Sequence, residues 1–516
     1  MKLSVLTHKL DAAHVLPGKG TAGEDPEIRG LCYRSDHACA GFVFVAMQGA
    51  NTDGHDYIAD AVSRGAVAVV VEKSVSADVM VIKVSDARRA LAIMADTFYD
   101  SPSKRMKLIG ITGTNGKTTT MCLLEHILRQ NHYKTGVIGT IDCHFDDHII
   151  AGTLTTPEAP DLQSRLARMA KAGVTHVIME VSSHGVVQDR IFGCCFAMGI
   201  FTNLSRDHLD FHGSMDAYRA AKKQFFTTYI HGDAVAVINC DTDEGARLAV
   251  ELNDVKKIIV ETDSPRPNAK DSNNGTIWAE NLSFDQKGIS GRVICHGDGF
   301  DFHSPLVGRF NLENIMCAVA ASLELGVKPH IIRNAIATFT NVSGRLERVV
   351  NNSSRHVFVD YCHTPDALEN VLKNLKVIVP GRLICVFGCG GDRDRGKRPL
   401  MGTIAANIAD IAIVTSDNPR TESPQAIIAE ILEGVRLTGK LEVAPDLQGA
   451  DCMKNGYAVE PDRSKAIEMG IRVSNPGDVV LIAGKGHETY QIIGTTINSF
   501  DDRVHAQQAL AKYGME

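Results

Sequence analysis

A six-residue loop between an apolar run and a helical pattern constrains this chain more than any other feature. Lys107–Thr112 is predicted to be a short buried strand, residues 113–118 read Gly-Thr-Asn-Gly-Lys-Thr, and a helix is predicted from Thr119 to Arg129. Glycines let backbone N–H groups close around phosphate oxygens, and a helix N-terminus adds the positive end of its dipole. Lys117 supplies a mobile cation for terminal phosphates, and the Thr118 hydroxyl can ligate Mg²⁺. The loop therefore predicts a nucleotide-binding α/β domain.

The spacing of this loop departs from the strict phosphate-loop pattern, because Ile111 stands where that pattern has glycine. A Gly-rich strand-to-helix turn with an exposed lysine is the alternative interpretation. The strand before the loop and the helix after it favour nucleotide binding over this alternative.

A chain of 516 residues is too long for a single hydrophobic core, so several domains are expected. Apolar runs and helical patterns divide it into three regions. The first region, 1–105, contains a small β-α-β unit: strands Phe42–Met47 and Ala66–Val71 around a helix Tyr57–Arg64. Residues 101–104, Ser-Pro-Ser-Lys, are typical of a linker.

The second region, 106–342, and the third, 343–516, each alternate strands with helices. Strands are predicted at Val137–Gly139, His176–Met179, Ala197–Phe201 and Ala234–Ile238 in the second region, and at His356–Val359, Leu383–Phe387, Ile411–Thr415 and Val479–Ala483 in the third. This alternation predicts a mostly parallel sheet wrapped by helices in the second region and a Rossmann-like α/β domain in the third. Residues 440–457 have weak periodicity and are expected to form a surface insertion.

Composition excludes several classes of protein. With 54 basic and 61 acidic residues the net charge is −7, which argues against general nucleic-acid binding. No window approaches the roughly 18 uninterrupted apolar residues of a membrane span. The 13 cysteines are scattered without a CxxC pair, which favours reduced thiols and a cytoplasmic location.

Acidic and imidazole side chains follow two predicted strands of the second region. Glu180 ends the strand that begins at His176, where a carboxylate beside a phosphate loop is well placed to hold Mg²⁺. Two histidines and two aspartates lie within residues 207–212, just after another strand. A solvated polar loop is the better interpretation of any one of them, whereas the whole cluster favours a functional role.

Two Gly-containing segments follow strands of the third region. Residues 388–398 carry four basic side chains after a Gly turn, and residues 484–488 read Gly-Lys-Gly-His-Glu. The first segment fits an anion site and a solvated charge run equally well.

Taken in order, these motifs resemble those of the Mur ligases of peptidoglycan synthesis, over essentially the whole chain. The segments that carry the resemblance are Gly113–Thr118, Glu180–His184, Asn203–Asp210, Tyr218–Lys222, Gly308–Asn311 and Asp360–Pro365. Within the family the chain is most similar to the MurE type, which adds the third residue of the stem peptide. Asp417-Asn418-Pro419-Arg420 is similar to the motif of members that add meso-diaminopimelate, and lysine-adding members carry different residues there.

The resemblance implies three α/β domains: a small N-terminal UDP-binding domain (1–105), a central P-loop parallel-sheet ATPase domain (106–342) and a C-terminal Rossmann-like domain that binds the amino acid (343–516). It implies ATP- and Mg²⁺-dependent ligation of meso-2,6-diaminopimelate to UDP-N-acetylmuramoyl-L-alanyl-D-glutamate through an acyl phosphate, by a monomer. A lysine-adding enzyme, or another Mur or folylpolyglutamate-type amide ligase, is the alternative within this superfamily. A non-enzymatic nucleotide switch is the alternative of a different class.

The resemblance also implies roles for individual residues. The catalytic residues would be Lys117, Glu180, His208 and Lys222, with Lys222 carbamylated to N6-carboxylysine. The residues that bind Mg²⁺ would be Thr118, Glu180, His208 and Lys222. ATP would contact Gly113, Thr114, Asn115, Gly116, Lys117, Thr118, Asn311, Arg345 and Asp360. The UDP-substrate would contact Ser35, Thr155, Thr156, Ser182, Gln188 and Arg190. Diaminopimelate would contact Arg393, Asp417, Asn418, Pro419, Arg420, Gly484 and Glu488, where arginine suits a carboxylate because its fork binds in a bidentate manner.

One segment departs from the family pattern. MurE enzymes usually read Asp-Ser-Arg in the first domain, whereas this chain has Arg34-Ser35-Asp36, which leaves open the side chain that meets the diphosphate. The resemblance also places ATP between the second and third domains, so the third domain is expected to swing on a linker near Asn341–Gly344.

Overall fold

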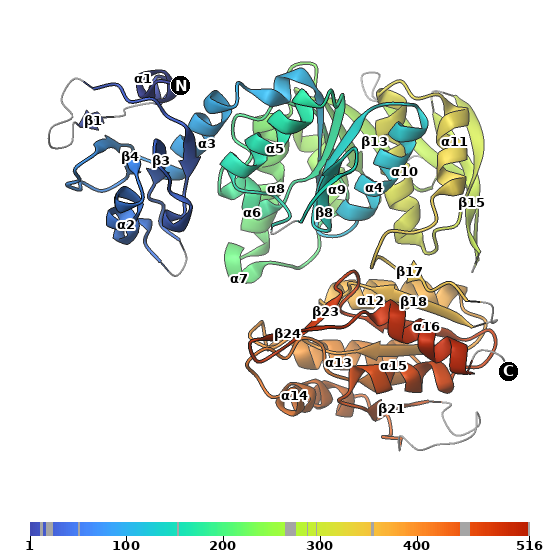
Figure 1. The fold of residues 1–516 in the computed structure, drawn as a ribbon. Coiled ribbons are helices and arrows are strands. Elements are labelled where there is room, and N and C mark those ends of the chain that lie inside the picture. The colour runs from blue at the N-terminus through green and yellow to red at the C-terminus, as the bar shows by residue number, and fades with distance from the viewer. Residues whose placement is uncertain are drawn as a thin grey trace.

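The computed structural model describes residues 1–10, 14–16, 24–49, 52–151, 154–263, 275–285, 287–295, 297–351, 355–443 and 455–513. The chain forms three α/β domains, each built around its own sheet. The N-terminal and middle domains lie side by side, and the C-terminal domain lies below the middle domain in Figure 1. The predicted boundaries after residues 105 and 342 fall in connections between elements, before the first strands of the second and third sheets.

The N-terminal domain has a five-stranded sheet with the order β1-β5-β4-β3-β2. Its elements are α1 (Leu3–Thr7), β1 (His14–Leu16), β2 (Gly30–Cys32), η1 (Ser35–His37), β3 (Phe42–Val45), η2 (Gly54–Tyr57), α2 (Ile58–Ser63), β4 (Ala66–Val71), β5 (Met80–Lys83) and α3 (Ala87–Phe98). The parallel pair β3–β4 with α2 between them confirms the predicted β-α-β unit. The predicted linker at 101–104 largely forms a short helix, η3 (Pro102–Arg105), in which Pro102 and Ser103 are buried.

The middle domain has an eleven-stranded sheet with the order β16-β15-β14-β13-β12-β11-β6-β10-β7-β8-β9. Its strands are β6 (Lys107–Thr112), β7 (Thr135–Ile138), β8 (Asp142–Phe145), β9 (His148–Ala151), β10 (His176–Glu180), β11 (Phe196–Phe201), β12 (Val235–Asn239), β13 (Lys256–Glu261), β14 (Gly275–Asp285), β15 (Gly288–Cys295) and β16 (Asp298–Ser304). Its helices are α4 (Lys117–Gln130), α5 (Ala159–Lys171), α6 (Ser183–Val187), α7 (Leu209–His212), α8 (Met215–Tyr229), α9 (Asp243–Glu251), α10 (Arg309–Glu324) and α11 (Pro329–Thr338).

The centre of this sheet is parallel, as the alternation of strands and helices predicts. Both neighbours of β6, the strands β10 and β11, run parallel to it, so the carboxyl ends of all three strands meet at the phosphate loop. Both edges carry antiparallel strands, β8–β9 on one side and β15–β16 on the other, so the whole sheet is mixed. These edge strands were not predicted, because they are half exposed and lack the continuous apolar runs of buried parallel strands.

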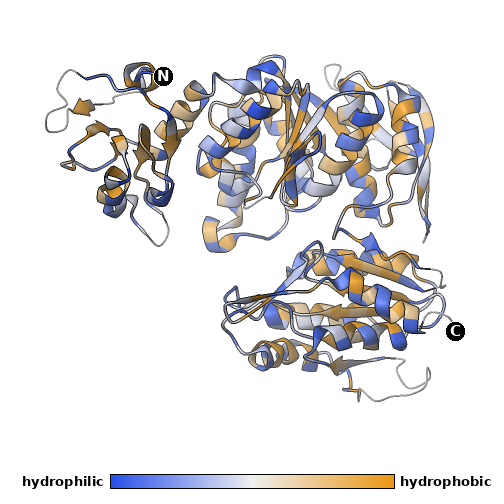
Figure 2. Ribbon diagram, viewed as in Figure 1, coloured by the Kyte–Doolittle hydropathy of each residue, from blue (hydrophilic) through white to orange (hydrophobic). Residues whose placement is uncertain are grey.

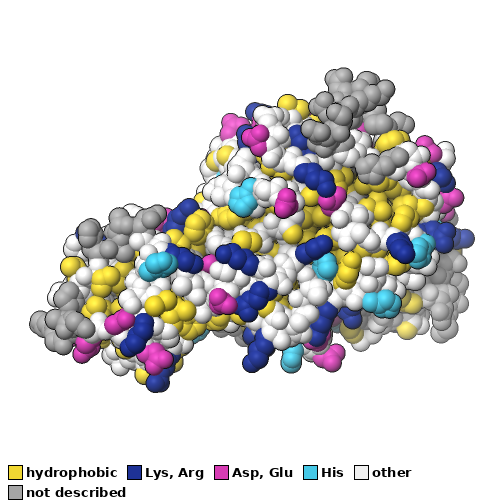
Figure 3. Space-filling model, turned by 90° about the horizontal axis from the view of Figure 1, so that it is seen from above, with side chains coloured by type: hydrophobic (Ala, Val, Ile, Leu, Met, Phe, Trp, Pro, Cys, Tyr) yellow, Lys and Arg dark blue, Asp and Glu magenta, His cyan; other side chains and the backbone are white. Residues whose placement is uncertain are grey.

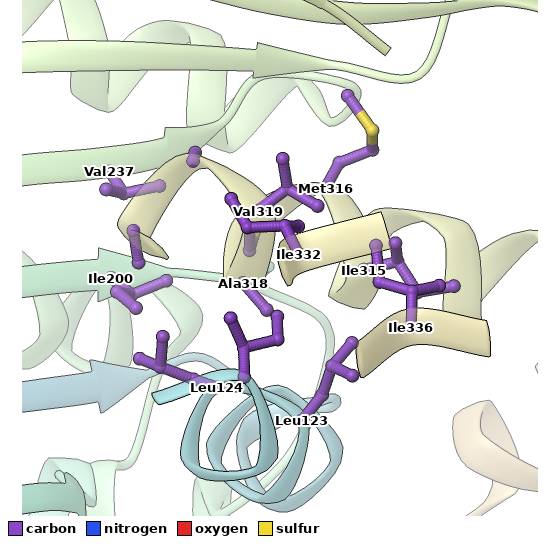
Figure 4. Close-up of a cluster of buried hydrophobic side chains, with 14 of the residues drawn as sticks. Leu123, Leu124, Ile200, Val237, Ile315, Met316, Ala318, Val319, Ile332 and Ile336 are labelled. Atoms are coloured by element: carbon purple, nitrogen blue, oxygen red, sulfur yellow. The ribbon is translucent and has the colours of Figure 1, made fainter. Parts of the chain in front are cut away.

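The core of the middle domain lies between the sheet and the helices α4, α10 and α11. Leu123 and Leu124 of α4 point toward Ile315 and Val319 of α10, and all four side chains are fully buried (Figure 4). Apolar residues concentrate in the strands of this sheet, and hydrophilic residues on the outer turns of its helices (Figure 2). Burial of this kind contributes about 25 cal/mol per Å² of apolar surface, so the core fixes α4 and the loop that precedes it.

Helix α4 begins at Lys117, two residues before the predicted start, because of the backbone conformation of Gly116. Gly116 has φ +84°, and an added Cβ would lie 2.2 Å from Asn314 Oδ1. Only glycine combines that left-handed conformation with so close a neighbour, so the loop can turn directly into the helix.

The C-terminal domain has a six-stranded sheet with the order β17-β18-β22-β19-β20-β21, antiparallel only at β17. Its elements are β17 (Glu347–Arg348), β18 (His356–Asp360), α12 (Pro365–Ile378), β19 (Leu383–Phe387), α13 (Lys397–Ile408), β20 (Ile411–Val414), α14 (Pro424–Arg436), β21 (Gly456–Val459), α15 (Arg463–Arg472), β22 (Val479–Ala483), the hairpin β23 (Tyr490–Ile493) with β24 (Thr496–Ser499), and α16 (Asp502–Tyr513). The predicted insertion at 440–457 ends within β21, and its residues 444–454 lie outside the described residues.

The N-terminal and middle domains meet through small side chains. Ala92 and Ala95 of α3 pack with Ala159 of α5, and all three are buried. The Tyr33 hydroxyl donates a hydrogen bond to Asp161 of α5 (2.9 Å).

Acidic, basic and histidine side chains are interspersed over the face that the N-terminal and middle domains present in Figure 3. Among the described residues, none of the helices combines the length and the apolar character that crossing a membrane requires.

Candidate active site

The phosphate loop forms the floor of a cleft between the middle and C-terminal domains. The Lys117 ammonium donates to the carbonyl oxygens of Gly113 and Thr114, both at 2.9 Å. The Asn115 backbone N–H donates to Asn203 Oδ1 (2.9 Å), which fixes the loop to the segment that follows β11. The loop therefore has a defined shape, with a lysine at the first turn of α4 that phosphate oxygens can attract.

Glu180 lies at the carboxyl end of β10, directly beside the loop. Its Oε1 atom accepts hydrogen bonds from Thr118 Oγ1 (2.9 Å) and from the Thr140 backbone N–H (3.0 Å), and its Oε2 atom accepts one from Thr140 Oγ1 (2.9 Å). The structure thus joins the predicted pair Thr118 and Glu180. Thr140, which follows β7, was missed, although a polar residue just after a parallel strand is a signal that could have found it.

Lys222 contacts the loop from behind rather than from the cleft. Its buried ammonium donates to the Gly113 carbonyl (2.8 Å) and lies 4.6 Å from the centre of the Tyr218 ring. Burial, reinforced by the nearby Lys117, lowers the pKa of Lys222 well below its ordinary value. A buried amine with a lowered pKa gives up its proton more readily than an exposed lysine, which favours the neutral, nucleophilic form.

His208 belongs to a group of aromatic rings around α7. Its ring centre is 4.9 Å from that of His184, and its Nε2 atom is 3.5 Å from Asp207 Oδ2. Burial lowers the pKa of His208 and that of His184, the latter to about 4. Both rings are therefore neutral near pH 7, the form in which imidazole can ligate a cation.

The C-terminal domain supplies the other wall of the cleft, which encloses about 580 Å³. Arg345 reaches across to the middle domain, where its Nη2 atom lies 3.4 Å from Thr118 Oγ1. Predicted residues on the cleft walls are Thr114, Asn115, Gly116, Lys117, Thr118, Thr155, Glu180, Ser182, His208, Asn311, Arg345 and Asp360. Gly113 and Lys222 lie behind this lining.

Asp360 was expected to take ribose hydroxyls, but its carboxylate already has partners in the backbone. Its Oδ2 atom accepts from the Leu346 N–H (2.6 Å) and its Oδ1 atom from the Cys362 N–H (2.7 Å). Burial raises the pKa of this carboxyl. In this structure Asp360 braces the segment that carries Arg345, and its contact with a nucleotide stays a prediction.

The residues predicted to contact the UDP-substrate in the middle domain lie together at the carboxyl end of β10. Thr156 Oγ1 donates to the Glu180 carbonyl (2.9 Å) and accepts from the Ser182 N–H (2.9 Å). Arg190 donates to the Thr156 carbonyl (2.9 Å) and to Gln188 Oε1 (2.5 Å). The remaining member, Thr155, shares a hydrogen bond with Thr140 (3.0 Å). Thr156 is itself fully buried, so it shapes this surface from below.

The divergent segment of the N-terminal domain is closed on itself. Arg34 forms a bidentate ion pair with Asp36 (3.0 and 2.7 Å), and the Ser35 side chain hydrogen-bonds to Asp60. The two charges of the inverted motif therefore neutralise each other in this structure. Ser35 follows Tyr33 by two residues, which places the segment close to the start of α5.

A second group of side chains lies at the carboxyl ends of β20 and β22 and contains most of the predicted diaminopimelate residues. Asn418 donates to Glu488 Oε2 (2.8 Å) and accepts from the buried Lys485 ammonium (3.1 Å). Gly484 has φ +118°, and an added Cβ would lie 2.5 Å from Asp417 Oδ2, so only glycine fits there. Lys485, which was missed, is 3.3 Å from Glu488 Oε2.

The two predicted arginines of this group differ in how they are held. Arg420 donates from Nη1 to the Gly391 carbonyl (2.8 Å), and its backbone N–H donates to the Ile492 carbonyl of β23 (3.1 Å). Pro419 lies against the same Gly turn, and Arg393 is exposed beside it. The amino-acid group adjoins the cleft through Tyr361, whose ring lies 4.8 Å from the Arg345 guanidinium and 5.0 Å from the His487 ring.

The donors around the phosphate loop fit Mg²⁺. Thr118 and Glu180 offer a hydroxyl and a carboxylate, the hard oxygen ligands that this cation takes together with phosphate oxygens and water. No cluster of three or more His, Cys, Asp or Glu side chains suited to a metal occurs within the described part of the chain.

Three family profiles match the chain in order. They are described as Mur ligase family, catalytic domain (residues 27–99), Mur ligase middle domain (111–322) and Mur ligase, glutamate ligase domain (344–486). Three α/β domains, with a phosphate loop facing a second ligand-bearing domain, agree with these matches. The chain belongs to the Mur ligase family, which confirms the resemblance seen in its motifs.

Its relatives include the UDP-N-acetylmuramoyl-L-alanyl-D-glutamate--2,6-diaminopimelate ligase of Geobacter metallireducens, which is 46% identical over 503 residues and 96% of each chain. The ligase of the same name from Trichormus variabilis is 43% identical over 522 residues and 99% of each chain. A solved structure under this name superposes with a TM-score of 0.66 at 32% identity, covering 94% of this chain and 95% of the other. The MurF ligase of Thermotoga maritima, solved with ADP, shares the fold at 17% identity, with a TM-score of 0.60 over 94% of this chain and 97% of that one.

Proposed function

We propose that this enzyme joins meso-2,6-diaminopimelate to the D-glutamyl side-chain carboxylate of UDP-N-acetylmuramoyl-L-alanyl-D-glutamate, with ATP as the source of an acyl phosphate. The observation that carries the proposal is the cleft in which the phosphate loop of one domain meets Arg345 of the next, in a chain that matches ligases of this name along almost its full length. An amide ligase needs such a meeting place, because phosphoryl transfer and amine attack occur at the same carboxyl group.

The phosphate end of the cleft would serve the first step. Lys117 would exchange its two carbonyl partners for the terminal phosphates of ATP, and Thr118 with Glu180 would hold Mg²⁺. Asn311, Arg345 and Asp360 would complete the nucleotide site from α10 and the C-terminal domain. A bound Mg²⁺ would neutralise the negative charge that collects as the carboxylate and the phosphate approach each other.

Lys222 and His208 would hold a second Mg²⁺ near the loop. A free lysine ammonium repels a cation, whereas a carbamate supplies an anionic oxygen. The lowered pKa of Lys222 supports this proposal, since only the neutral amine adds to carbon dioxide. Carbamylation would also remove the repulsion between Lys222 and Lys117 that the unmodified side chains share.

The amino-acid group of the C-terminal domain would select the incoming amine. Arg420 and Arg393 would bind a carboxylate of diaminopimelate, and Glu488 would bind the ammonium at the far end, with Asp417, Asn418, Pro419 and Gly484 shaping the pocket. Lysine lacks the second carboxylate, so it would leave a desolvated arginine without a partner, which is costly.

The nucleotide-sugar peptide would lie along the N-terminal and middle domains. Thr155, Thr156, Ser182, Gln188 and Arg190 would receive it beside Glu180, and Ser35 would mark its UDP end. We also propose that the enzyme acts in the cytoplasm as a monomer, which light scattering would show as a mass near the 55.8 kDa of one chain.

Phosphate release by the purified full chain tests this function. We expect release from ATP only when the UDP-muramyl dipeptide and meso-diaminopimelate are both present, and a tripeptide product detected by mass spectrometry. Lys117→Ala should abolish release and serves as the control for contaminating ATPases. Release with lysine in place of diaminopimelate would favour a lysine-adding ligase, and release without either amino acid would favour a nucleotide switch.

A further inference from the structure

Arg398 is a fully buried cation beneath the amino-acid group and contacts none of the residues predicted to bind substrate. Its Nη1 and Nη2 atoms donate to Glu422 Oε2 (2.9 Å) and Oε1 (2.8 Å) in a bidentate pair. Its Nη1 atom also donates to Glu430 Oε2 (2.8 Å), and its Nη2 atom to the Gly390 carbonyl (3.3 Å). The side chain has no exposed surface, so any effect on substrate must pass through these partners.

Glu422 transmits this contact to two loops that lie side by side. The first loop, 390–393, carries Arg393, and the second, 417–422, carries Arg420. Glu422 Oε1 accepts from the Asp392 backbone N–H (2.6 Å), so the carboxylate that pairs with Arg398 also holds the first loop. The Glu422 N–H donates to the Pro419 carbonyl (3.1 Å), which closes the turn of the second loop.

Further hydrogen bonds join the two loops directly. The Gly391 N–H donates to the Asn418 carbonyl (2.9 Å), and Arg420 Nη1 donates back to the Gly391 carbonyl (2.8 Å). The Thr421 hydroxyl donates to Asp392 Oδ1 (2.7 Å). All these bonds lie within one small region, so the position of Arg420 depends on the first loop as much as on its own.

Both loops contain a non-glycine residue in the left-handed region of the backbone. Asp392 has φ +54° and Arg420 has φ +50°. Residues other than glycine adopt this conformation only when their surroundings hold them there. The ion pair of the fully buried Arg398 with the partly exposed Glu422 lies at the base of both turns, and the removal of the guanidinium from water makes the geometry of its partners decisive.

We infer that Arg398 is a positioning residue for the amino-acid substrate: through Glu422 it fixes the two loops that present Arg393 and Arg420 to a carboxylate. This inference rests on the proposed function, because it assigns to that function a residue that does not touch the substrate. A carboxylate bound by a bidentate arginine tolerates little displacement, since both N–H···O bonds need the guanidinium plane in one orientation.

The test compares steady-state kinetics of the full chain and its variants, with each of the three substrates varied in turn. For Arg398→Met and for Glu422→Gln we expect KM for diaminopimelate to rise roughly ten- to hundred-fold, with kcat and KM for ATP near the parent values. Arg398→Lys should lie between, because it keeps the charge and loses the fork. The double variant should be little worse than either single one, because both changes break the same pair.

Arg395→Ala is the matched control. Arg395 lies three residues away on the exposed side and pairs with Glu430, but it forms neither a hydrogen bond nor an ion pair with Glu422. Its KM for diaminopimelate should stay at the parent value. If Arg398→Met does not fold, Glu422→Gln decides the question.

An unchanged KM for diaminopimelate in the Glu422→Gln and Arg398 variants would overturn the inference, and so would equal losses for all three substrates. If the parent enzyme releases no phosphate with diaminopimelate, the proposed function fails before any variant is compared.

Discussion

At the scale of single residues, Lys222 shows how burial prepares a side chain for chemistry. Its amine is enclosed, bonded to the Gly113 carbonyl and close to Lys117, so the protonated form is destabilised. We expect ¹³C-labelled bicarbonate to give a carbamate signal in the NMR spectrum of the parent enzyme. Lys222→Ala should lose this signal and roughly 10²- to 10³-fold in kcat. The neighbouring Lys223, which pairs with Glu251 on the surface, provides the control variant Lys223→Ala. A signal that persists in Lys222→Ala would assign the carbamate elsewhere.

Glu313, on the wall of the cleft, should make stability depend on pH. Burial and then Asp241 raise its pKa to about 7 from the usual 4.5, against smaller opposing effects of Asn239 and Arg309. The unfolded chain therefore loses this proton first, and stability falls as pH rises from about 4.5 to about 7. Glu313→Gln should be more stable than the parent at pH 8, by on the order of 1–3 kcal/mol, and not at pH 4.

Trp278, the one tryptophan of the chain, lies in β14. Its fluorescence reports unfolding of the middle domain. Thermal midpoints followed at this residue between pH 4 and pH 8 measure the effect of Glu313→Gln. Glu324 lies on the same helix as Glu313, and its carboxylate pairs with the surface residue Lys256. The stability difference between Glu324→Gln and the parent should therefore not change with pH in this way. Parallel pH profiles for the parent and Glu313→Gln would contradict the expectation.

At the scale of elements, the phosphate loop depends on the packing of α4 against α10. Leu124 is fully buried in that contact (Figure 4), so Leu124→Ala should cost about 2–5 kcal/mol by leaving a cavity. Urea unfolding followed at Trp278 measures this loss. Val250→Ala, on the exposed face of α9, should leave the midpoint unchanged. A loss below about 1 kcal/mol would mean that the helices close over the cavity.

The same element scale shows what could be predicted from the sequence. The bounds of β6, β19 and β22 agree with prediction, because a strand buried on both faces is a continuous apolar run. The strands β14–β16 and the hairpin β23–β24 were missed, since half-exposed strands carry weaker patterns. Glu180 lies on the cleft wall at the end of β10, and Asp417 lies beside Gly484 after β20, while the roles of both residues stay predictions. Arg398 could not be predicted, because its partner lies 24 residues away and only the fold joins them.

At the scale of the whole molecule, Asp366 links the middle and C-terminal domains. Its Oδ2 atom accepts from Ser205 Oγ (2.6 Å) and Asn115 Nδ2 (3.3 Å) across the cleft. We expect Asp366→Ala to open the molecule, so that its radius of gyration exceeds that of the parent in small-angle scattering. ATP together with both other substrates should restore the compact form, because they bridge the domains.

Glu369→Ala provides the comparison, because Glu369 lies on the same helix but pairs with Lys373 of its own domain. Its scattering should match that of the parent. Identical scattering of Asp366→Ala and the parent, with and without substrates, would refute a swing of the C-terminal domain on the segment 341–344.

The alanine contact between α3 and α5 has a consequence for the order of events in a reaction cycle. Ala92, Ala95 and Ala159 pack directly against one another, so the two helix backbones lie close together. The N-terminal and middle domains would then move as one body, and the nucleotide-sugar peptide would lie along this body from its uridine to its glutamate. The amine would bind to the C-terminal domain, which would move relative to the other two domains. The motion of that domain would therefore determine when the amine reaches the activated carboxyl group. A compound that binds along the N-terminal and middle domains alone would inhibit the enzyme in both the open and the closed arrangement of the C-terminal domain.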